Sequence, residues 1–157
     1  MELNICQAKN KDIFQIIKLI EKWYHVFGDE VNTDRYDFDL ADIEKFYSEN
    51  NGIFLIATVE EIIVGTVSCI RISDDILEMK RLYVNQTYWG KGVAQRLYSE
   101  ILIYANKNKY KKIILYTDNR YERSHGFHKK NGFVLTEKKE MFDADNPYIS
   151  LKFELDL

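Results

Sequence analysis

Apolar residues follow a helical period near the start of the chain. They recur three or four positions apart, which predicts a helix over 13–27 that Gly28 ends. A strand-like run over 3–6 precedes this helix. A second helix is predicted over about 40–50, where Asn-Asn-Gly interrupts the pattern. The first third of the chain is therefore predicted as one strand and two helices.

The period changes to that of strands in the middle of the chain. The run 53–59 is rich in β-branched and aromatic residues, and a Glu-Glu turn leads into a similar run over 62–70. These two strands are predicted to pair antiparallel. A third strand over 76–84 follows an Asp-Asp turn, and a helix with core candidates at helical spacing is predicted over 93–107.

The last part of the chain alternates strands with a short helix. A continuous apolar run over 112–117 is typical of a strand buried on both faces. A helix over 124–130 and strands over 133–141 and 148–155 complete the order β-α-α-β-β-β-α-β-α-β-β. This order predicts an α/β (α+β) fold with a mixed, mostly antiparallel sheet of about seven strands and helices on both faces. The strand before the 93–107 helix and the strand after it are expected to form a right-handed parallel crossover.

The composition is that of one globular domain, so 1–157 is treated as a single domain. The 157 residues are 46% apolar and 30% charged, and the formal net charge of −3 gives no indication of nucleic-acid binding. The first residues lack the features of a signal peptide, and no apolar run is long enough to cross a bilayer. We therefore expect a cytoplasmic protein with neither a nucleic-acid nor a membrane partner.

The two cysteines, Cys6 and Cys69, lie in apolar, strand-like segments and belong to no CxxC or Cys/His cluster. Buried free thiols are the simpler interpretation, and a metal or redox role is the alternative. We expect no metal site.

Two glycines mark the junction between strand 76–84 and helix 93–107, in the sequence Trp-Gly-Lys-Gly-Val-Ala. The first turn of a helix has free backbone N–H groups and a partial positive charge, and phosphate is their usual ligand. Glycines there leave room for a ligand, although a sharp turn alone also explains them. A Walker loop is absent, and the third glycine of a dinucleotide fingerprint is missing.

Two segments carry a resemblance to a known family. The stretches 78–84 and 89–94 resemble the acetyl-CoA motif of the GCN5-related N-acetyltransferases (GNAT), whose loop reads Arg/Gln-x-x-Gly-x-Gly/Ala. The stretch 124–133 is similar to the second signature of the family, which usually ends Phe-Tyr-x-x-x-Gly-Phe. The order of predicted elements also matches the family fold, so the resemblance covers nearly the whole chain.

The resemblance implies that acetyl-CoA is the co-substrate, and it assigns residues to it. The loop amides of the family hold the CoA diphosphate, and here they belong to Gly90, Lys91, Gly92, Val93, Ala94 and Gln95. The strand before the loop splays from its parallel neighbour, and its freed backbone groups at Leu82 and Val84 are expected to pair with the pantetheine arm. An amide near Tyr83 or Val84 would polarise the acetyl carbonyl. Asn119 resembles an asparagine that contacts the CoA arm, and capping the next turn is its alternative role.

The chain departs from the family pattern at two positions. Trp89 stands where the family usually has Arg or Gln, which removes one side-chain contact to phosphate; the indole instead covers the ligand or packs on the helix. His128 occupies the position of the tyrosine that protonates the departing thiolate. A protonated imidazole is expected to do the same at neutral pH. The alternative is a surface substitution at 128, with water, Tyr121 or Tyr83 as the acid.

Glu78 is the candidate general base, because it matches a glutamate that serves as base in several family members. Strand alternation predicts that Glu78, Lys80, Leu82 and Val84 share one face. The alternatives are an ion pair of Glu78 with a neighbouring Lys or Arg, and a chain of water molecules that removes the proton of the amine.

The acceptor implied by the resemblance is a small-molecule or peptide amine. Aromatic and acidic residues are concentrated in the segment that walls the acceptor site of the family, and a cationic amine would suit them. A solvated acidic loop is the alternative. The residues are Trp23, Tyr24, Phe27, Tyr36, Phe38, Asp29, Glu30, Asp34, Asp37 and Asp39.

The sequence is interpreted as an acetyltransferase that passes acetyl directly to an amine. No Cys or Ser lies in a nucleophile-and-base arrangement, so a covalent enzyme intermediate is not expected. The competing interpretations are a CoA-binding sensor or interaction protein with little catalysis, and a transferase of a longer acyl chain. Many relatives form homodimers, so a homodimer is a further expectation.

Overall fold

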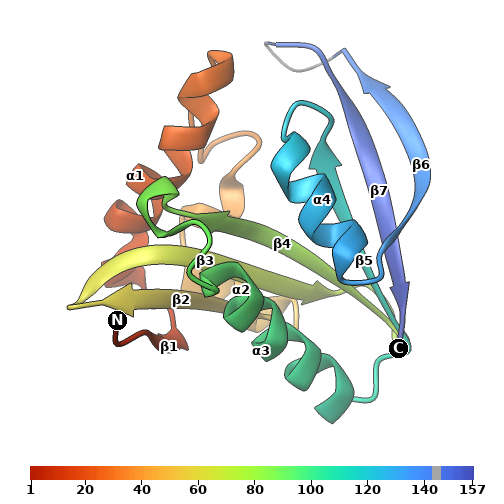
Figure 1. Ribbon diagram of the computed structural model, residues 1–157, viewed down its shortest axis with the longest axis horizontal. Coiled ribbons are helices and arrows are strands. Elements are labelled where there is room, and N and C mark those ends of the chain that lie inside the picture. Colours follow the sequence, from red (N-terminus) through yellow and green to blue (C-terminus); the bar gives the residue numbers. More distant parts are fainter. Residues whose placement is uncertain (143–145) are drawn as a thin grey trace.

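The computed structural model describes residues 1–142 and 146–157, and its strands form one seven-stranded sheet (Figure 1). The sheet has the order β1-β2-β3-β4-β5-β7-β6, in which only β4 and β5 run parallel. The predicted mixed, mostly antiparallel sheet and the parallel crossover are confirmed. The strands are β1 (Asn4–Gln7), β2 (Ile53–Val59), β3 (Ile62–Arg71), β4 (Ile76–Val84), β5 (Lys112–Asp118), β6 (Val134–Met141) and β7 (Tyr148–Asp156).

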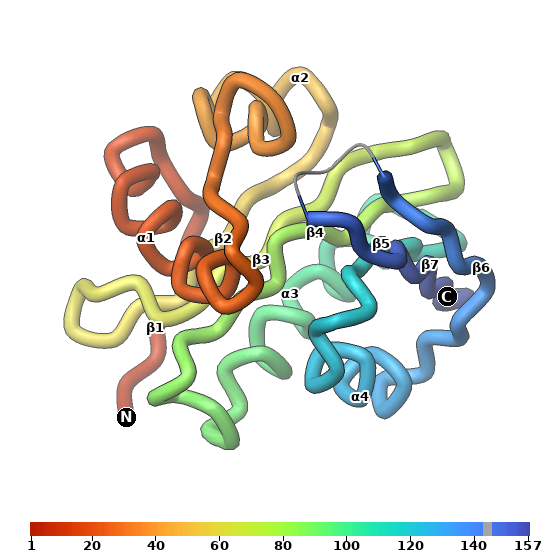
Figure 2. The backbone as a smooth tube through the Cα atoms, turned by 90° about the horizontal axis from the view of Figure 1, so that it is seen from above, coloured from red at the N-terminus to blue at the C-terminus, as the bar shows by residue number. Residues whose placement is uncertain are grey.

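Helices cover both faces of the sheet, as predicted. Figure 2 shows α1 and α2 on one side of the strands and α3 and α4 on the other. The helices are α1 (Ile13–Tyr24), α2 (Ile43–Glu49), α3 (Val93–Lys107) and α4 (Glu122–Lys130). Among the described residues, none of these helices has both the length and the apolar character needed to span a membrane.

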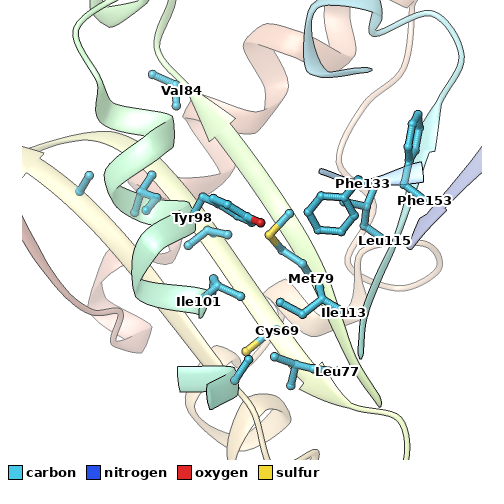
Figure 3. Packing of buried hydrophobic residues seen from close by; sticks show 14 of the residues in the cluster. Cys69, Leu77, Met79, Val84, Tyr98, Ile101, Ile113, Leu115, Phe133 and Phe153 are labelled. Carbon is cyan, nitrogen blue, oxygen red and sulfur yellow. The ribbon is translucent and has the colours of Figure 1, made fainter. Parts of the chain in front are cut away.

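The two faces of the sheet bury separate hydrophobic cores. The core under α3 joins Ile101 of that helix to Leu77 and Met79 of β4 and to Ile113 of β5 (Figure 3). Leu97 of α3 belongs to the same core. The core on the other face lies under α1 and α2. Burial of these apolar side chains is the main force that holds the helices on the sheet. The α3 core also sets the position of the glycine junction, because α3 begins there.

A glycine in β3 lets the start of α3 approach the sheet closely. A Cβ atom at Gly65 would lie 3.0 Å from side-chain atoms of Leu97 and Val93. A larger residue would therefore push the first turns of α3 outward.

Several predicted boundaries shift. The first helix ends at Tyr24 and continues as a 3₁₀ turn to Phe27, and α4 begins at Glu122 rather than at 124. Strand β5 was expected to be buried on both faces, which is wrong for its second half, because Tyr116 is 52% exposed. This exposure coincides with the opening of the sheet described below.

Candidate active site

Strands β4 and β5 separate after a short parallel contact. Their paired residues are Ile76 with Lys112, Leu77 with Ile113 and Glu78 with Ile114. Beyond these pairs, β4 stays bonded to β3 and β5 stays bonded to β7, so the two strands diverge (Figure 1). In the described part of the chain no strand fills the gap. The facing backbone edges are therefore available to an extended ligand, except at the Val84 carbonyl, which accepts a hydrogen bond from the Trp89 indole.

A β-bulge changes the direction of β4 where the gap opens. Thr66 pairs with Tyr83 and Ser68 pairs with Lys80, so β4 has one residue more than β3 between these two pairs. Arg81 lies in the bulge with a φ of +57°, and its carbonyl accepts a hydrogen bond from the Thr66 hydroxyl at 2.7 Å. The bulge reverses the alternation of side chains along the rest of the strand.

The predicted common face of Glu78, Lys80, Leu82 and Val84 is therefore wrong. Val84 packs in the α3 core together with Met79, the residue next to Glu78. Since neighbours in a strand point to opposite faces, Glu78 and Val84 lie on different sides of the sheet.

Arg81 ties the bulge to the segment after α1. Its guanidinium donates to Asp39 through Nη2 at 2.6 Å and Nε at 3.1 Å, and Nη1 lies 2.9 Å from Asp37 and 3.0 Å from the Tyr24 hydroxyl. Burial alone would raise the pKa of Asp39, but Arg81 outweighs burial and lowers it. Burial alone would lower the pKa of Arg81, but Tyr24 and Asp39 raise it. The buried pair therefore stays charged at neutral pH.

The glycine junction forms an open backbone surface at the start of α3. Gly90 and Gly92 have φ values of +74° and +81°, in the left-handed region that favours glycine. A Cβ atom on either residue would meet no other atom within 4 Å, so the junction faces open space. Gly92 is the N-cap and provides no side chain to the amides of the first turn. These amides are free to bind an anion.

The junction lines a cleft of about 810 Å³ between the diverging strands, called here the first cleft. Its lining includes Leu82, Tyr83 and Val84 of β4, as well as Trp89 and His128. Among the described residues, five cationic side chains and one carboxylate also line it: Lys80, Arg81, Arg120, Arg123, Lys130 and Glu122. Lys80, Arg81 and Arg120 are paired with carboxylates, so the weakly electropositive character of the cleft comes from Arg123 and Lys130.

A second cleft of about 720 Å³ lies beside the first. In the part of the chain that the structure describes, six carboxylates and three cationic side chains line it, so its charge is opposite: Asp29, Glu30, Asp34, Asp37, Glu78, Asp118, Lys80, Arg81 and Arg120. The two clefts share residues of β4, of β5 and of the turn into α4, so they meet in the gap between the strands. The shared residues are Met79, Lys80, Arg81, Tyr83, Tyr116, Thr117, Arg120 and Tyr121.

Comparisons with known proteins identify the family of the chain. Residues 15–133, more than half of the chain, match the acetyltransferase (GNAT) family. The chain belongs to the GNAT acetyltransferase family. N-acetylaspartate synthetase of Xenopus tropicalis is 33% identical over 97 residues, which cover 60% of this chain but only 36% of that protein.

Solved structures share the GNAT fold over the full chain. An acetyltransferase from Streptococcus agalactiae 2603 superposes with a TM-score of 0.85 at 24% identity, covering 99% of this chain and 98% of that one. The PaiA N-acetyltransferase from Thermoplasma acidophilum, solved in complex with coenzyme A, superposes with a TM-score of 0.77 at 20% identity. The superposition covers 100% of each chain.

Most residues assigned to the coenzyme by the GNAT motif lie together in the first cleft. Gly90 and Gly92 line it with Val93, Ala94 and Gln95. Lys91 does not, and its Nζ lies 5.1 Å from the centre of the Tyr88 ring. Tyr88 itself lines the cleft, so the Lys91 ammonium lies next to a residue of the cleft wall.

Asn119 lies away from the other candidates. Its side-chain oxygen accepts a hydrogen bond at 2.9 Å from the backbone N–H of Ile149 in β7, and it lines neither cleft. The side chain is therefore directed at β7, and its expected contact with the CoA arm stays a prediction. Asn119 does not cap the turn that follows β5. In that turn the Asp118 side chain accepts the hydrogen bond from the Arg120 backbone N–H.

Glu78 lies in the second cleft, at the last paired position before β4 and β5 separate. Its carboxylate is 3.2 Å from Lys80 Nζ, and its side chain is 14% exposed. The ion pair with a neighbouring lysine, one of the alternatives, is present. The position at the mouth of the gap also fits the role of general base, which stays a prediction.

His128 lines the first cleft, but its environment differs from the expected one. It is 4% exposed and lies among the rings of Phe127, Phe133 and Phe153, and its Nδ1 has no partner. Burial, with a smaller effect of His125, lowers the pKa of His128 to about 4. With a pKa this low the ring is neutral at pH 7, which argues against the expected imidazolium acid; that role stays a prediction. The alternative of a surface position is wrong, because the side chain is buried.

Tyr121 lines both clefts at the turn into α4. Burial, with the nearby Tyr83 and Asp118, raises its pKa, so the phenol keeps its proton at neutral pH. Its ring lies edge-on to Phe27 with centroids 5.3 Å apart. Tyr121 is thus a protonated donor at the meeting point of the clefts.

Trp23 of α1 was expected at the acceptor site, but its contact with Trp89, and that of Arg123 of α4, have no signal in the sequence. Trp23 stacks on Trp89 with centroids 5.2 Å apart and 15° between planes, and Arg123 lies 4.1 Å from the centre of the Trp89 ring. The Trp89 indole donates to the Val84 carbonyl at 3.3 Å. Contacts between such distant segments have no local sequence pattern that predicts them.

The acidic and aromatic segment divides between the two clefts. Trp23 and Phe27 line the first, whereas Phe38 and Asp39 line neither. The others line the second cleft: Tyr24, Tyr36, Asp29, Glu30, Asp34 and Asp37.

The cysteines lie outside both clefts. Cys69 is buried, as expected, and burial raises the pKa of its thiol to about 12. Cys6 is exposed on β1, which corrects the expectation of a buried thiol.

Proposed function

We propose that the chain transfers an acetyl group from acetyl-CoA directly to an amine. The observation that carries the proposal is the pair of oppositely charged clefts that meet where β4 and β5 separate. An anionic coenzyme fits the electropositive cleft, and an amine fits the electronegative one. Their meeting point allows one acyl transfer between two bound molecules.

The coenzyme would be held mainly by backbone groups. Its diphosphate would lie against the amides of Gly92, Val93 and Ala94, and the pantetheine arm would follow the free edge of β4. A backbone N–H near Tyr83 or Val84 would then stabilise the oxyanion of the tetrahedral intermediate.

Proton transfers would use groups on both sides of the gap. Glu78 would accept one proton from the bound ammonium, which frees the nitrogen lone pair to attack the thioester carbonyl, and the second proton of the nitrogen would pass to the departing thiolate. The CoA thiolate would then leave, and the neutral Tyr121 hydroxyl would donate a hydrogen bond to it. Both cysteines lie outside the clefts, which supports direct transfer without an acyl-enzyme.

The charge of the second cleft favours a cationic amine as the acceptor. N-acetylaspartate synthetase is named for an anionic acceptor, but a dicarboxylate would meet an excess of carboxylates in this chain. Spermidine is therefore expected to give a higher kcat/KM than aspartate when both are tested with acetyl-CoA. A preference for aspartate would contradict this choice of acceptor.

The role of Glu78 is tested by Glu78→Gln. We expect kcat to fall about 100-fold or more, since general base catalysis contributes roughly that much, while the Kd for CoA stays unchanged. Glu61→Gln, in the exposed turn between β2 and β3, is the matched control and should keep full activity. An unchanged kcat in Glu78→Gln would exclude the direct base and favour a chain of water molecules.

A CoA-binding sensor is the second candidate function, because the neutral His128 deprives the site of the expected acid. Thiol release from acetyl-CoA across a panel of amines separates the two functions. Release that an amine stimulates supports the transferase. CoA binding without stimulated release by any amine supports the sensor.

A further inference from the structure

The Trp89 ring stacks with a cationic side chain from another part of the fold. The guanidinium carbon of Arg123, on α4, lies 4.1 Å from the centre of the Trp89 ring. Guanidinium groups stack favourably on indole faces, which restricts the motion of a long side chain. Arg123 is thereby held beside the residue that precedes Gly90.

Arg123 differs from the other arginines of the first cleft in its partners. Arg81 is paired with Asp37 and Asp39, and Arg120 with Asp29 and Asp118. Within residues 1–142 and 146–157, no carboxylate forms an ion pair with Arg123, and its side chain is exposed. Its five N–H donors are therefore available to an anionic ligand.

Trp89 is itself fixed next to the glycine junction. Its indole N–H donates to the Val84 carbonyl at 3.3 Å, and its ring stacks on Trp23 of α1. Trp89 and Arg123 both line the first cleft, together with Gly90 and Gly92. The cation over the indole thus lies on the same cleft wall as the free amides of α3.

We infer that Arg123 binds the diphosphate of CoA. It would take over the role of the Arg or Gln that the GNAT motif usually has at the position occupied here by Trp89. The inference rests on the proposed function. A guanidinium forms paired, charge-assisted hydrogen bonds with phosphate oxygens, which complement the backbone amides of the junction. In this chain α4 supplies the charge, and the loop supplies the aromatic surface that orients it.

The test measures the affinity of Arg123→Gln for three ligands: CoA, 3′-dephospho-CoA and pantetheine. The first two contain the diphosphate, and pantetheine does not. We expect Kd to rise roughly tenfold for CoA and for 3′-dephospho-CoA, because a charge-assisted contact is lost, and to stay unchanged for pantetheine. Arg123→Lys should recover part of the loss, since it keeps the charge but not the planar stack.

Lys129→Gln is the matched control, because Lys129 is an exposed cation on the same helix that does not line the cleft. Its Kd for CoA should stay within about twofold of the wild-type value, which separates a specific contact from a general loss of positive charge. Melting temperatures close to the wild-type value should show that both variants are folded.

Three results for Arg123→Gln would overturn the inference. They are an unchanged Kd for CoA, a loss of affinity confined to CoA, and an equal loss of affinity for pantetheine. A loss confined to CoA would assign Arg123 to the 3′-phosphate instead. If the wild-type protein bound no CoA, the proposed function would fail. Normal wild-type binding with an unaffected variant would reject the role of Arg123 alone.

Discussion

At the scale of single residues, burial decides what His128 can do. Its position in the second GNAT signature correctly places it in the first cleft, but the sequence does not reveal the three phenylalanine rings around it. These rings come from α4, from the turn after it and from β7. Their effect on the imidazole depends on tertiary packing, so the protonation state was not predictable from the motif.

The low pKa of His128 predicts a loss of stability in acid. The folded protein binds this proton near pH 4, whereas the unfolded chain binds it near pH 6.5. Because the unfolded state binds more protons between these values, the free energy of unfolding falls as the pH drops below about 6.5. The contribution of His128 between pH 7 and pH 4.5 is about 2 kcal/mol.

His128→Phe removes this dependence. Chemical denaturation gives the free energy of unfolding at pH 7 and at pH 4.5. The decrease between these two pH values should be smaller by about 2 kcal/mol in the variant than in the wild type. Acetyl transfer at pH 7 should be retained, because the neutral ring donates no proton to the thiolate. His25→Gln, at an exposed position, is the control and should keep the wild-type difference. Loss of activity in His128→Phe together with retention in His128→Tyr would restore the acid role.

Arg81 neutralises two buried carboxylates, and its removal leaves them uncompensated. Arg81→Met should lower the free energy of unfolding by about 3–5 kcal/mol, measured by urea denaturation at pH 7. Arg71→Met is the control, since the Arg71 side chain is 42% exposed and pairs with the exposed Asp74 at the end of β3. That change should cost less than about 1 kcal/mol. Equal losses in the two variants would show that the buried pairs contribute no more than a surface pair.

At the scale of elements, the sequence predicts segments better than it predicts the direction of side chains within them. The bounds 76–84 and 93–107 agree with β4 and α3, because periodic apolar residues and the glycine junction define both. The bulge at Arg81 has no comparable signal, since it depends on pairing with β3. The inserted residue reverses every later side chain of β4.

The glycine junction is the element on which coenzyme binding depends. Gly92→Ala places a side chain at a φ of +81° and on the open surface where the diphosphate would lie. Calorimetric titration should show an affinity for CoA at least tenfold weaker, with a cost of about 1 kcal/mol in stability.

Gly126→Ala is the matched control for this change. Gly126 lies inside α4, and a Cβ atom there would meet nothing within 4 Å. Alanine should therefore raise the free energy of unfolding by about 0.5–1 kcal/mol and leave CoA binding unchanged. A normal affinity for CoA in Gly92→Ala would remove the junction from the binding site.

At the scale of the whole molecule, the opening of the sheet brings the site together. The order of elements predicts the parallel pair β4 and β5, and the family resemblance adds that they splay. The register shows that the contact ends at Glu78 and Ile114. The partners of the first cleft from α1 and α4, Trp23 and Arg123, meet Trp89 only because of this topology. Long-range contacts of this kind lie beyond what local patterns encode.

The opposite charges of the two clefts also arise at this scale. The net charge of −3 gives no sign of them, because the fold gathers carboxylates on the second cleft, while three of the cations line both clefts. The concentration of acidic residues after the first helix was visible in the sequence. Its assignment to one side of the gap required the structure.

The most direct measurement is a titration of ¹⁵N-labelled protein with CoA, followed by amide NMR shifts. We predict saturable shifts at Gly90, Gly92, Val93 and Ala94, and at Val84 on the free edge of β4, because these amides lie along the proposed path of the coenzyme. The amides of β6, at the far edge of the sheet, should not move. Amides at the junction that stay unshifted at millimolar CoA would contradict the account.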